Sequence, residues 1–209
     1  MAEWPDGFHY LPAYLDVARQ KQLVHDLGRI LEEAPLFEQR MPKTGALLSV
    51  RMSNAGQFGW VTDRNAGYRY QAHHPQTGSA WPTIPDRLLD IWHQLTDEVA
   101  PPNLYLINYY NGSAKLGLHQ DRGERSTNAP VVSISLGDDA VFVVGGLCRK
   151  AATRQLPLHS GDAVWFGGPS RLIFHGVEGI RIGSSTLLRE IGLDDGRINL
   201  TLRRIQAPL

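Results

Sequence analysis

The stretch LYLINYYNGSAKLGLHQD, residues 104–121, decides how this chain folds and where its chemistry lies. It predicts two short strands, residues 104–110 and 115–119, joined by a tight connection at Asn111-Gly112-Ser113. Asn and Gly accept a positive φ at little cost, which suits such a connection. Short runs of the same kind, bounded by Gly, Asn and Asp, continue to the end of the chain. The stretch therefore marks the start of a β-rich region.

The second of these strands ends in His119-Gln120-Asp121. Successive side chains of an extended chain point to opposite faces, so His119 and Asp121 project the same way while Gln120 points away from them. An imidazole and a carboxylate side by side supply two ligands of a facial metal site. A lone His-x-Asp is a weak signal, because it occurs by chance in many proteins. A third ligand is needed to complete the site.

His175 offers that third ligand, at the end of an apolar run that predicts a strand over residues 171–175. Such a run delivers the imidazole into the interior. Two histidines and one carboxylate form the triad that leaves positions open on Fe(II) for a co-substrate and O2. Zinc sites more often use cysteines or a histidine pair at helical spacing, and the sequence has neither pattern. The three residues therefore favour an iron site.

The segment RINLTLR, residues 197–203, predicts a strand with two different faces. Alternation places Arg197, Asn199 and Arg203 on one face, with the aliphatic side chains on the other. Arginines on a buried strand are costly unless they meet an anion, and the planar guanidinium group fits carboxylates best. A small dicarboxylate bound beside the metal would satisfy both arginines.

Turn residues separate about eight strand-like runs after residue 103, a pattern typical of a double-sheet jelly roll. Two amphipathic helices precede them, over residues 15–33 and 86–95. We therefore expect one domain over residues 1–209 with an α+β, mainly β fold: a double-stranded β-helix (jelly roll) with the N-terminal helices packed on one sheet. The strands are expected at residues 104–110, 115–119, 131–136, 140–144, 154–158, 162–165, 171–175 and 197–202.

Composition limits the partners that the chain can have. Lys+Arg and Asp+Glu are 21 each, so any contact with nucleic acid has to come from a local patch. Cys148 is the only cysteine, which excludes an intramolecular disulfide and fits a reducing compartment. The N-terminus has no signal-peptide pattern, and no apolar run approaches the ~20 residues of a membrane span. We expect a cytoplasmic protein with no membrane partner. We also expect a monomer, because nothing in the sequence requires a second subunit.

A local patch of the required kind lies between Gln39 and His74, where the only acid is Asp63. Cations for phosphates and rings for stacking are what flipped or single-stranded bases need. The alternative is a solvated loop in which Trp60 is simply buried in the core. Because a metal site is also predicted, a lid over the active site is the better interpretation. The cations and rings are Arg40, Lys43, Arg51, Arg64, Arg69, Phe58, Trp60, Tyr68 and Tyr70.

Further motifs accompany these residues in one order: NYY (108–110), AKLGLHQD (114–121), VSISLG (132–137), GGL (145–147), GD (161–162), GGPSR (167–171), HG (175–176) and NLTLR (199–203). With them, the sequence resembles the AlkB-type Fe(II)/2-oxoglutarate-dependent dioxygenases, a family of nucleic-acid demethylases. The resemblance runs from about Ser53 to Arg204. It implies that residues 1–103 hold the helices and a nucleotide-recognition lid, and residues 104–209 the jelly-roll core.

The resemblance also implies a role for each polar residue of the predicted site. The ligands of Fe(II) would be His119, Asp121 and His175. The residues that bind the co-substrate 2-oxoglutarate would be Asn108, Tyr110, Arg197, Asn199 and Arg203. Among these, Arg197 would pair with the far carboxylate and Arg203 with the carboxylate next to the keto group. O2 would take the remaining position on the iron.

On the substrate side, the resemblance implies contacts from Trp60, Tyr68, Tyr70, Glu124 and Arg149. A bacterial member of the family carries an acid two positions after the metal aspartate, where this chain has Gly123. We expect Glu124 to replace it; the alternative is weaker discrimination in favour of cationic bases. For Arg149, a solvated charge at the end of a strand is an equally good interpretation.

The implied activity is oxidative demethylation of N-alkylated bases such as 1-methyladenine and 3-methylcytosine, preferably in single-stranded DNA. 2-Oxoglutarate and O2 would be consumed, giving the repaired base, formaldehyde, succinate and CO2. Two alternatives stay open: a dioxygenase of the same fold acting on RNA or a small methylated molecule, and an inactive jelly-roll binding module. The basic, aromatic segment argues against a small substrate, and the complete set of metal and arginine residues argues against an inactive module.

Overall fold

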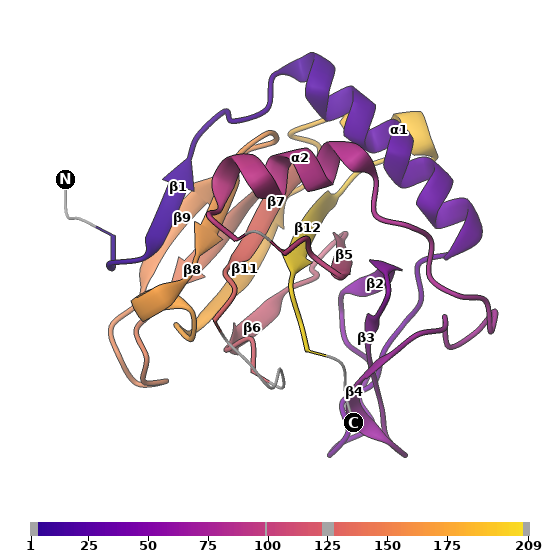
Figure 1. The fold of residues 1–209 in the computed structure, drawn as a ribbon, viewed down its shortest axis with the longest axis horizontal. Coiled ribbons are helices and arrows are strands. Elements are labelled where there is room, and N and C mark those ends of the chain that lie inside the picture. The colour runs from indigo at the N-terminus through magenta and orange to yellow at the C-terminus, as the bar shows by residue number, and fades with distance from the viewer. Residues whose placement is uncertain (1–3, 99, 123–127, 207–209) are drawn as a thin grey trace.

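Two antiparallel sheets form the centre of the computed structural model, which describes residues 4–98, 100–122 and 128–206 (Figure 1). Among these residues, the larger sheet has the strand order β1 (Phe8–Leu11), β10 (Ala163–Phe166), β7 (Val131–Gly137), β12 (Arg197–Arg203), β5 (Leu104–Tyr110) and β2 (Arg51–Gly56). The smaller sheet has the order β6 (Leu116–His119), β11 (His175–Arg181), β8 (Asp139–Val144) and β9 (Arg154–Leu158). One apolar cluster joins side chains of both sheets, including Leu106, Phe142 and Phe166. The predicted jelly roll is confirmed.

Helices α1 (Val17–Glu33) and α2 (Asp86–Leu95) cover the outer face of the larger sheet (Figure 1). Their apolar sides pack with that face in a second cluster, in which Leu27 and Trp92 are almost fully buried. The prediction of N-terminal helices on one sheet is therefore confirmed. No helix in the described ranges is long and apolar enough to cross a membrane.

Strand β12 serves both clusters because its side chains alternate. Ile198, Leu200 and Leu202 are buried against the helices. Arg197, Asn199, Thr201 and Arg203, on the opposite face, line a cavity between the two sheets. The two-faced strand expected from the sequence is thus present.

One strand prediction was wrong. Residues 171–174 are not a strand: a 3-10 turn at Gly168–Ser170 precedes them, and β11 begins at His175 instead of ending there. The apolar run is buried by packing, with Ile173 only 2% exposed, so its hydrophobicity gave a false strand signal. The tight connection after residue 110 exists, but β5 and β6 lie in different sheets, so it is a crossover and not a hairpin.

Four strands were not predicted: β1, β2, β3 (Gly59–Asp63) and β4 (Gly67–Gln71). β1 has only four residues, and the other three strands are rich in polar residues and Gly, which weakens the period-two signal. β2 extends the larger sheet beside β5, whereas β3 and β4 pair only with each other among the described residues. The segment predicted as a lid, residues 39–74, thus contains one strand of the larger sheet and a separate hairpin that projects beyond it (Figure 1).

The N-terminus of α1 allows a test of local stability. Asp16 caps the helix, since its Oδ1 accepts a hydrogen bond from the Arg19 amide at 2.8 Å. Asp16→Ala should lower the free energy of unfolding by about 1 kcal/mol, measured by urea denaturation. Glu33→Ala, at the exposed other end of the helix, should change it by less than about 0.5 kcal/mol. Equal effects of the two substitutions would contradict the capping role.

Candidate metal centre and its cavity

The three predicted metal ligands come together at one end of the smaller sheet. His119 Nε2 lies 3.7 Å from Asp121 Oδ1, and His175 Nε2 lies 3.7 Å from Asp121 Oδ2. One donor atom from each residue falls within 4.8 Å of the others, and this is the metal-type group found among the described residues. Two imidazoles and a carboxylate at these distances can hold one ion on one side, leaving the other side open.

The strand pairing explains why residues 56 positions apart meet. His119 is the last residue of β6, His175 is the first of β11, and the two are directly opposite in the antiparallel ladder. Gly176 permits this close approach, because a Cβ there would lie 2.6 Å from the Leu116 carbonyl oxygen. Asp121 follows β6 by two residues and is buried.

Each imidazole uses one nitrogen to contact the backbone and presents the other to the centre of the group. His119 Nδ1 lies 2.9 Å from the Gly117 carbonyl oxygen, and His175 Nδ1 lies 3.2 Å from that of Ile173. A carbonyl oxygen only accepts, so Nδ1 carries the proton and the Nε2 lone pair faces the group. This is the tautomer that a metal ion requires.

The electrostatics of the group favour a cation. Burial is the largest single influence and would raise the pKa of the Asp121 carboxyl. The Arg203 guanidinium, 2.7 Å from Oδ1, and the His175, His119 and Arg171 side chains together outweigh burial and hold that pKa well below its usual range. Burial, and second the His119 imidazole, lower the pKa of His175 to about 4. Asp121 is therefore ionised and His175 neutral at pH 7, which are the forms that bind metal.

Arg171, for which the sequence suggested no role, supports Asp121 from behind. Its side chain is buried; Nη1 donates to the Asp121 carbonyl oxygen at 3.2 Å and Nε to that of Ala129 at 2.7 Å. Its position in the GGPSR motif, as an arginine within an otherwise small and turn-forming run, was the available signal.

Arg197 is buried with unused hydrogen-bonding capacity. Its Nη2 donates to Ser135 Oγ at 3.0 Å, while Nε and Nη1 have no hydrogen-bond partner among the described residues. Asn108 Oδ1, on the neighbouring strand β5, is also buried without one in that part of the chain. Buried donors are normally paired, so this end of the cavity fits an anion. The Arg197 guanidinium lies over the Tyr110 ring, 5.4 Å from its centroid. Burial raises the pKa of Tyr110 to about 12.

The other predicted 2-oxoglutarate residues line the same cavity. Asn199 donates through Nδ2 to Ser133 Oγ at 2.5 Å and accepts from Thr201 Oγ1 at 3.0 Å, so its amide is held in place. Arg203 lies at the metal end, beside Asp121, and Arg197 lies beside Tyr110. The five residues expected to bind the dicarboxylate, Asn108, Tyr110, Arg197, Asn199 and Arg203, are all wall residues.

The cavity has a volume of about 910 Å³ and opens beside the β3–β4 hairpin. Trp60 and Tyr68 line its mouth with their rings stacked, 5.7 Å between centroids and 26° between planes. Arg149 is also in the wall, donating to the Leu118 carbonyl oxygen at 3.0 Å. Tyr70 is not among the wall residues, so the structure does not bring this predicted contact to the cavity. Glu124 lies outside the described residues.

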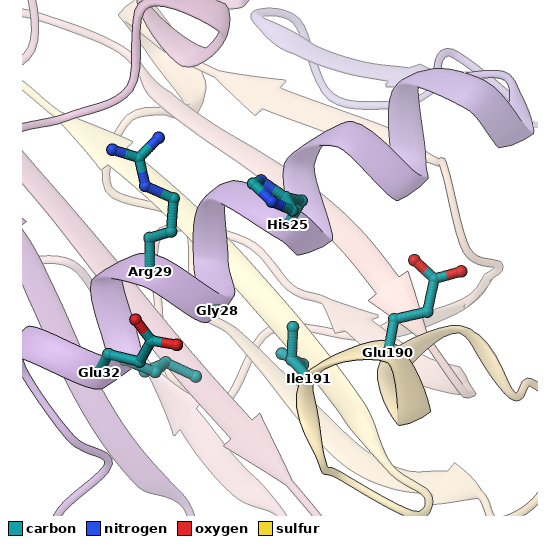
Figure 2. A pocket seen from close by; sticks show the side chains of 7 residues that line it. His25, Gly28, Arg29, Glu32, Glu190 and Ile191 are labelled. Carbon is teal, nitrogen blue, oxygen red and sulfur yellow. The ribbon is translucent and has the colours of Figure 1, made fainter.

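A second hollow, of about 520 Å³, lies between α1 and the 3-10 helix at Leu187–Ile191 (Figure 2). Gly28 lets the two helices approach, since a Cβ there would lie 2.8 Å from Ile191 Cγ2. Its polar walls include His25, Arg29 and Glu190. None of the predicted site residues lines it, so it is separate from the metal chemistry.

The residues present fit both groups that the sequence predicted. Asp121 Oδ2 is buried without a hydrogen-bond partner among the described residues, and two Nε2 lone pairs face it, as a divalent cation requires. The unpaired Arg197 nitrogens fit a carboxylate. The donor set of two nitrogens and one oxygen is that of Fe(II) oxygenases rather than structural zinc.

Comparison with known proteins identifies the family. Residues 7–203 match the family model described as the 2OG-Fe(II) oxygenase superfamily. The alpha-ketoglutarate-dependent dioxygenase AlkB homolog of Caulobacter vibrioides is 48% identical over 198 residues, covering 95% of this chain and 87% of that protein. The chain belongs to the AlkB-type 2OG-Fe(II) oxygenases. Fe(II), 2-oxoglutarate and O2 are therefore its cofactor, co-substrate and oxidant.

Other relatives of this oxygenase agree. The alpha-ketoglutarate-dependent dioxygenase AlkB of Escherichia coli is 38% identical over 192 residues, covering 88% of this chain and 84% of that protein. A DNA N(6)-methyladenine demethylase, ALKBH1C of Arabidopsis thaliana, is 31% identical over 95% of this chain and 48% of its own length. The solved structure of OsALKBH1 has a TM-score of 0.76 at 30% identity, covering 97% of this chain and all of that one.

Metal binding should stabilise this oxygenase through His175. Fe(II) added under argon at 100 times its Kd should raise the free energy of unfolding by about 2.7 kcal/mol. His175→Ala should abolish the gain, because one of three ligands is lost. Thermal denaturation with and without Fe(II) measures it. His159→Ala is the matched control, since that imidazole is exposed and contacts Asp139; a gain that survives His175→Ala would contradict the assignment.

The metal-free oxygenase should lose stability in mild acid. Because the folded pKa of His175 is about 4 and its ordinary value is 6.5, the unfolded chain binds more protons between these limits. The free energy of unfolding therefore falls as pH is lowered from 6.5 to about 4. His175→Asn should flatten this slope in urea denaturation at a series of pH values. An unchanged slope in the variant would contradict the buried, neutral state of His175.

Proposed function

We propose that the chain demethylates N-alkylated bases of nucleic acid by oxidation, with 1-methyladenine and 3-methylcytosine as typical substrates. The observation that carries this proposal is the cavity itself. One wall holds the metal group and two buried arginines, and its mouth holds two stacked rings. A small substrate would not need the stacked rings at the mouth, whereas a base turned out of its stack would.

We assign the metal to His119, Asp121 and His175, and the far carboxylate of 2-oxoglutarate to Arg197. Arg203, beside Asp121, is at the end where the carboxylate next to the keto group would lie. Two Arg197 nitrogens, Nε and Nη1, support this assignment, because they are buried donors with no hydrogen-bond partner among the described residues and a carboxylate is an acceptor. Asn108, Tyr110 and Asn199 would complete the binding of the co-substrate by hydrogen bonds.

Bound iron would supply the oxidation: O2 would take two electrons from 2-oxoglutarate, which leaves as succinate and CO2, and two from the methyl group, which becomes hydroxymethyl and is lost as formaldehyde. The protein orients the metal-binding side chains and excludes water from the site. Phe166 and Phe142 have ring centroids 5.0 and 5.9 Å from that of His175, which keeps water away from this side of the metal group. Arg171 binds the Asp121 backbone, and the Gly117 carbonyl oxygen binds the His119 ring. Both side chains are therefore oriented before the metal or the substrate binds.

Trp60 and Tyr68 would contact the flipped base, and Arg149 a phosphate or the base edge. Lys115 and Arg122 are further cavity-wall cations, so the rim is basic although the whole chain is neutral. We propose a single-stranded substrate, because an unpaired base costs less to turn out than a paired one. Tyr70 would support Trp60, its register partner across β3 and β4. Glu124 remains a predicted contact for cationic bases.

The proposal treats residues 1–209 as one domain, a cytoplasmic monomer. Residues 1–103 would supply the helices and the nucleotide-recognition lid, and residues 104–209 the catalytic jelly roll. Two observations support one domain: strands β1 and β2 belong to the same sheet as β5, β7, β10 and β12, and both helices pack on that sheet. DNA and RNA differ at the 2′-hydroxyl, which a substrate comparison tests directly.

The decisive assay measures formaldehyde and succinate released from a single-stranded DNA oligonucleotide that carries 1-methyladenine, with Fe(II), ascorbate and 2-oxoglutarate. Wild type should release both in equal amounts. His175→Ala should lower the rate of release by more than roughly 10–100-fold, which is the loss of activity expected when only the supporting partner of a metal ligand is removed. His159→Ala should retain activity, as a matched control.

Each other outcome of the assay has a meaning. Release of succinate without formaldehyde would mean that this oligonucleotide is not the substrate. An RNA oligonucleotide with the same lesion would then be tested next. Faster release from RNA than from DNA would overturn the strand preference but not the reaction. Tight binding of the methylated oligonucleotide with no consumption of 2-oxoglutarate would favour the inactive binding module.

A further inference from the structure

The outer edge of β3 has no partner strand among the described residues. Two buried side-chain amides bind its backbone there, together with the Arg40 amide, which donates to the Thr62 carbonyl oxygen at 3.4 Å. Both residues of the pair, Gln39 and Asn54, are at most 1% exposed. Among the described residues β3 pairs only with β4, so the backbone groups on its other edge need partners from elsewhere. Gln39 precedes β2 and Asn54 lies within it, so the pair connects the hairpin to the larger sheet.

The two amides satisfy the backbone of Trp60 on both sides. Asn54 Oδ1 accepts from the Trp60 amide at 3.0 Å. The Trp60 carbonyl oxygen accepts from Asn54 Nδ2 and from Gln39 Nε2, each at 3.4 Å. Gln39 Oε1 also accepts from the Thr62 amide at 2.5 Å. Three backbone groups of β3 are thus held by side chains that are 6 to 23 residues distant.

The same pair reaches the cavity wall at a second point. Gln39 Nε2 lies 3.1 Å from Met52 Sδ, and Met52, like Trp60, is a wall residue. The Trp60 ring stacks on Tyr68, which is 57% exposed. Trp60 therefore connects the hairpin to the larger sheet, and the two amides bind its backbone rather than its ring.

We propose that Gln39 and Asn54 are positioning residues that fix the aromatic wall of the nucleotide site before substrate binds. This inference rests on the proposed function, since it takes Trp60 as the base-stacking residue. Binding is weakened when a contact surface has to be ordered at the moment of binding, and a wall that is already ordered avoids this cost. Neither residue touches the metal group or the dicarboxylate end of the cavity, so their effect should be confined to the nucleotide.

The test compares two Michaelis constants in the full chain loaded with Fe(II). Gln39→Met keeps an unbranched side chain of similar length and removes the amide. It should raise the KM for the 1-methyladenine oligonucleotide about tenfold, as expected for loss of a buried hydrogen bond, and leave the KM for 2-oxoglutarate within about twofold. Asn54→Leu should do the same. Gln57→Leu, which removes an exposed amide from the turn between β2 and β3, should change neither constant.

Amide hydrogen exchange by NMR provides a readout that does not depend on activity. Gln39→Met should speed exchange at Thr62, and Asn54→Leu should speed exchange at Trp60, each about tenfold, because each substitution removes the acceptor of that amide. Gln57→Leu should alter neither. Unchanged exchange in both test variants would overturn the proposal.

Two kinetic outcomes would also overturn it. One is an oligonucleotide KM within about twofold of wild type in a variant whose Trp60 or Thr62 amide exchanges faster. The other is a parallel rise of both Michaelis constants, which indicates general loss of stability. If the wild type releases formaldehyde from no methylated oligonucleotide, the proposed function has failed, and the exchange rates alone then decide whether the amides hold the hairpin.

Discussion

Burial of charge between two sheets is the constraint on which this structure depends. Arg197, Arg203 and Asp121 are each at most 7% exposed and line one cavity. Charges so far from water are tolerated only when they are paired or will be paired by a ligand. Asp121 and Arg203 pair with each other, whereas Arg197 keeps two nitrogens unused. The fold therefore maintains a site whose electrostatic balance is completed by what binds there.

The jelly roll accommodates this constraint by giving one strand two environments. On β12, aliphatic side chains pack under the helices while arginines and Asn199 face the cavity. The helices support the cavity indirectly. They bury the aliphatic face of β12, and the strand can therefore present polar side chains to the cavity on its other face. The metal ligands come instead from the smaller sheet, where His119 and His175 are direct neighbours across β6 and β11. The metal group and the cavity-facing arginines therefore come from different sheets, and Asp121 lies beside both, in the segment after β6.

Sequence patterns predicted the parts whose signals are local. The bounds of α2, β5 and β9 agree with the sequence-based ranges, and the His-x-Asp pattern with a distant histidine identified the metal group. Patterns failed where packing decides: residues 171–174 are apolar without being a strand, and β3 and β4 are polar strands. Gln39 and Asn54 carried no signal, because an amide reveals its role only through partners that folding brings to it. The same holds for Arg171, whose two carbonyl partners are 42 and 50 residues away.

The hairpin of β3 and β4 forms its own small sheet, apart from the two sheets that support the metal and the co-substrate. A Cβ at Gly67, beside the turn of this hairpin, would meet no atom within 4 Å. The metal group lies on other elements, since His119 ends β6 and His175 begins β11. The shape of the cavity mouth and the position of the metal donors are therefore set by separate parts of the chain, and a change in one need not move the other.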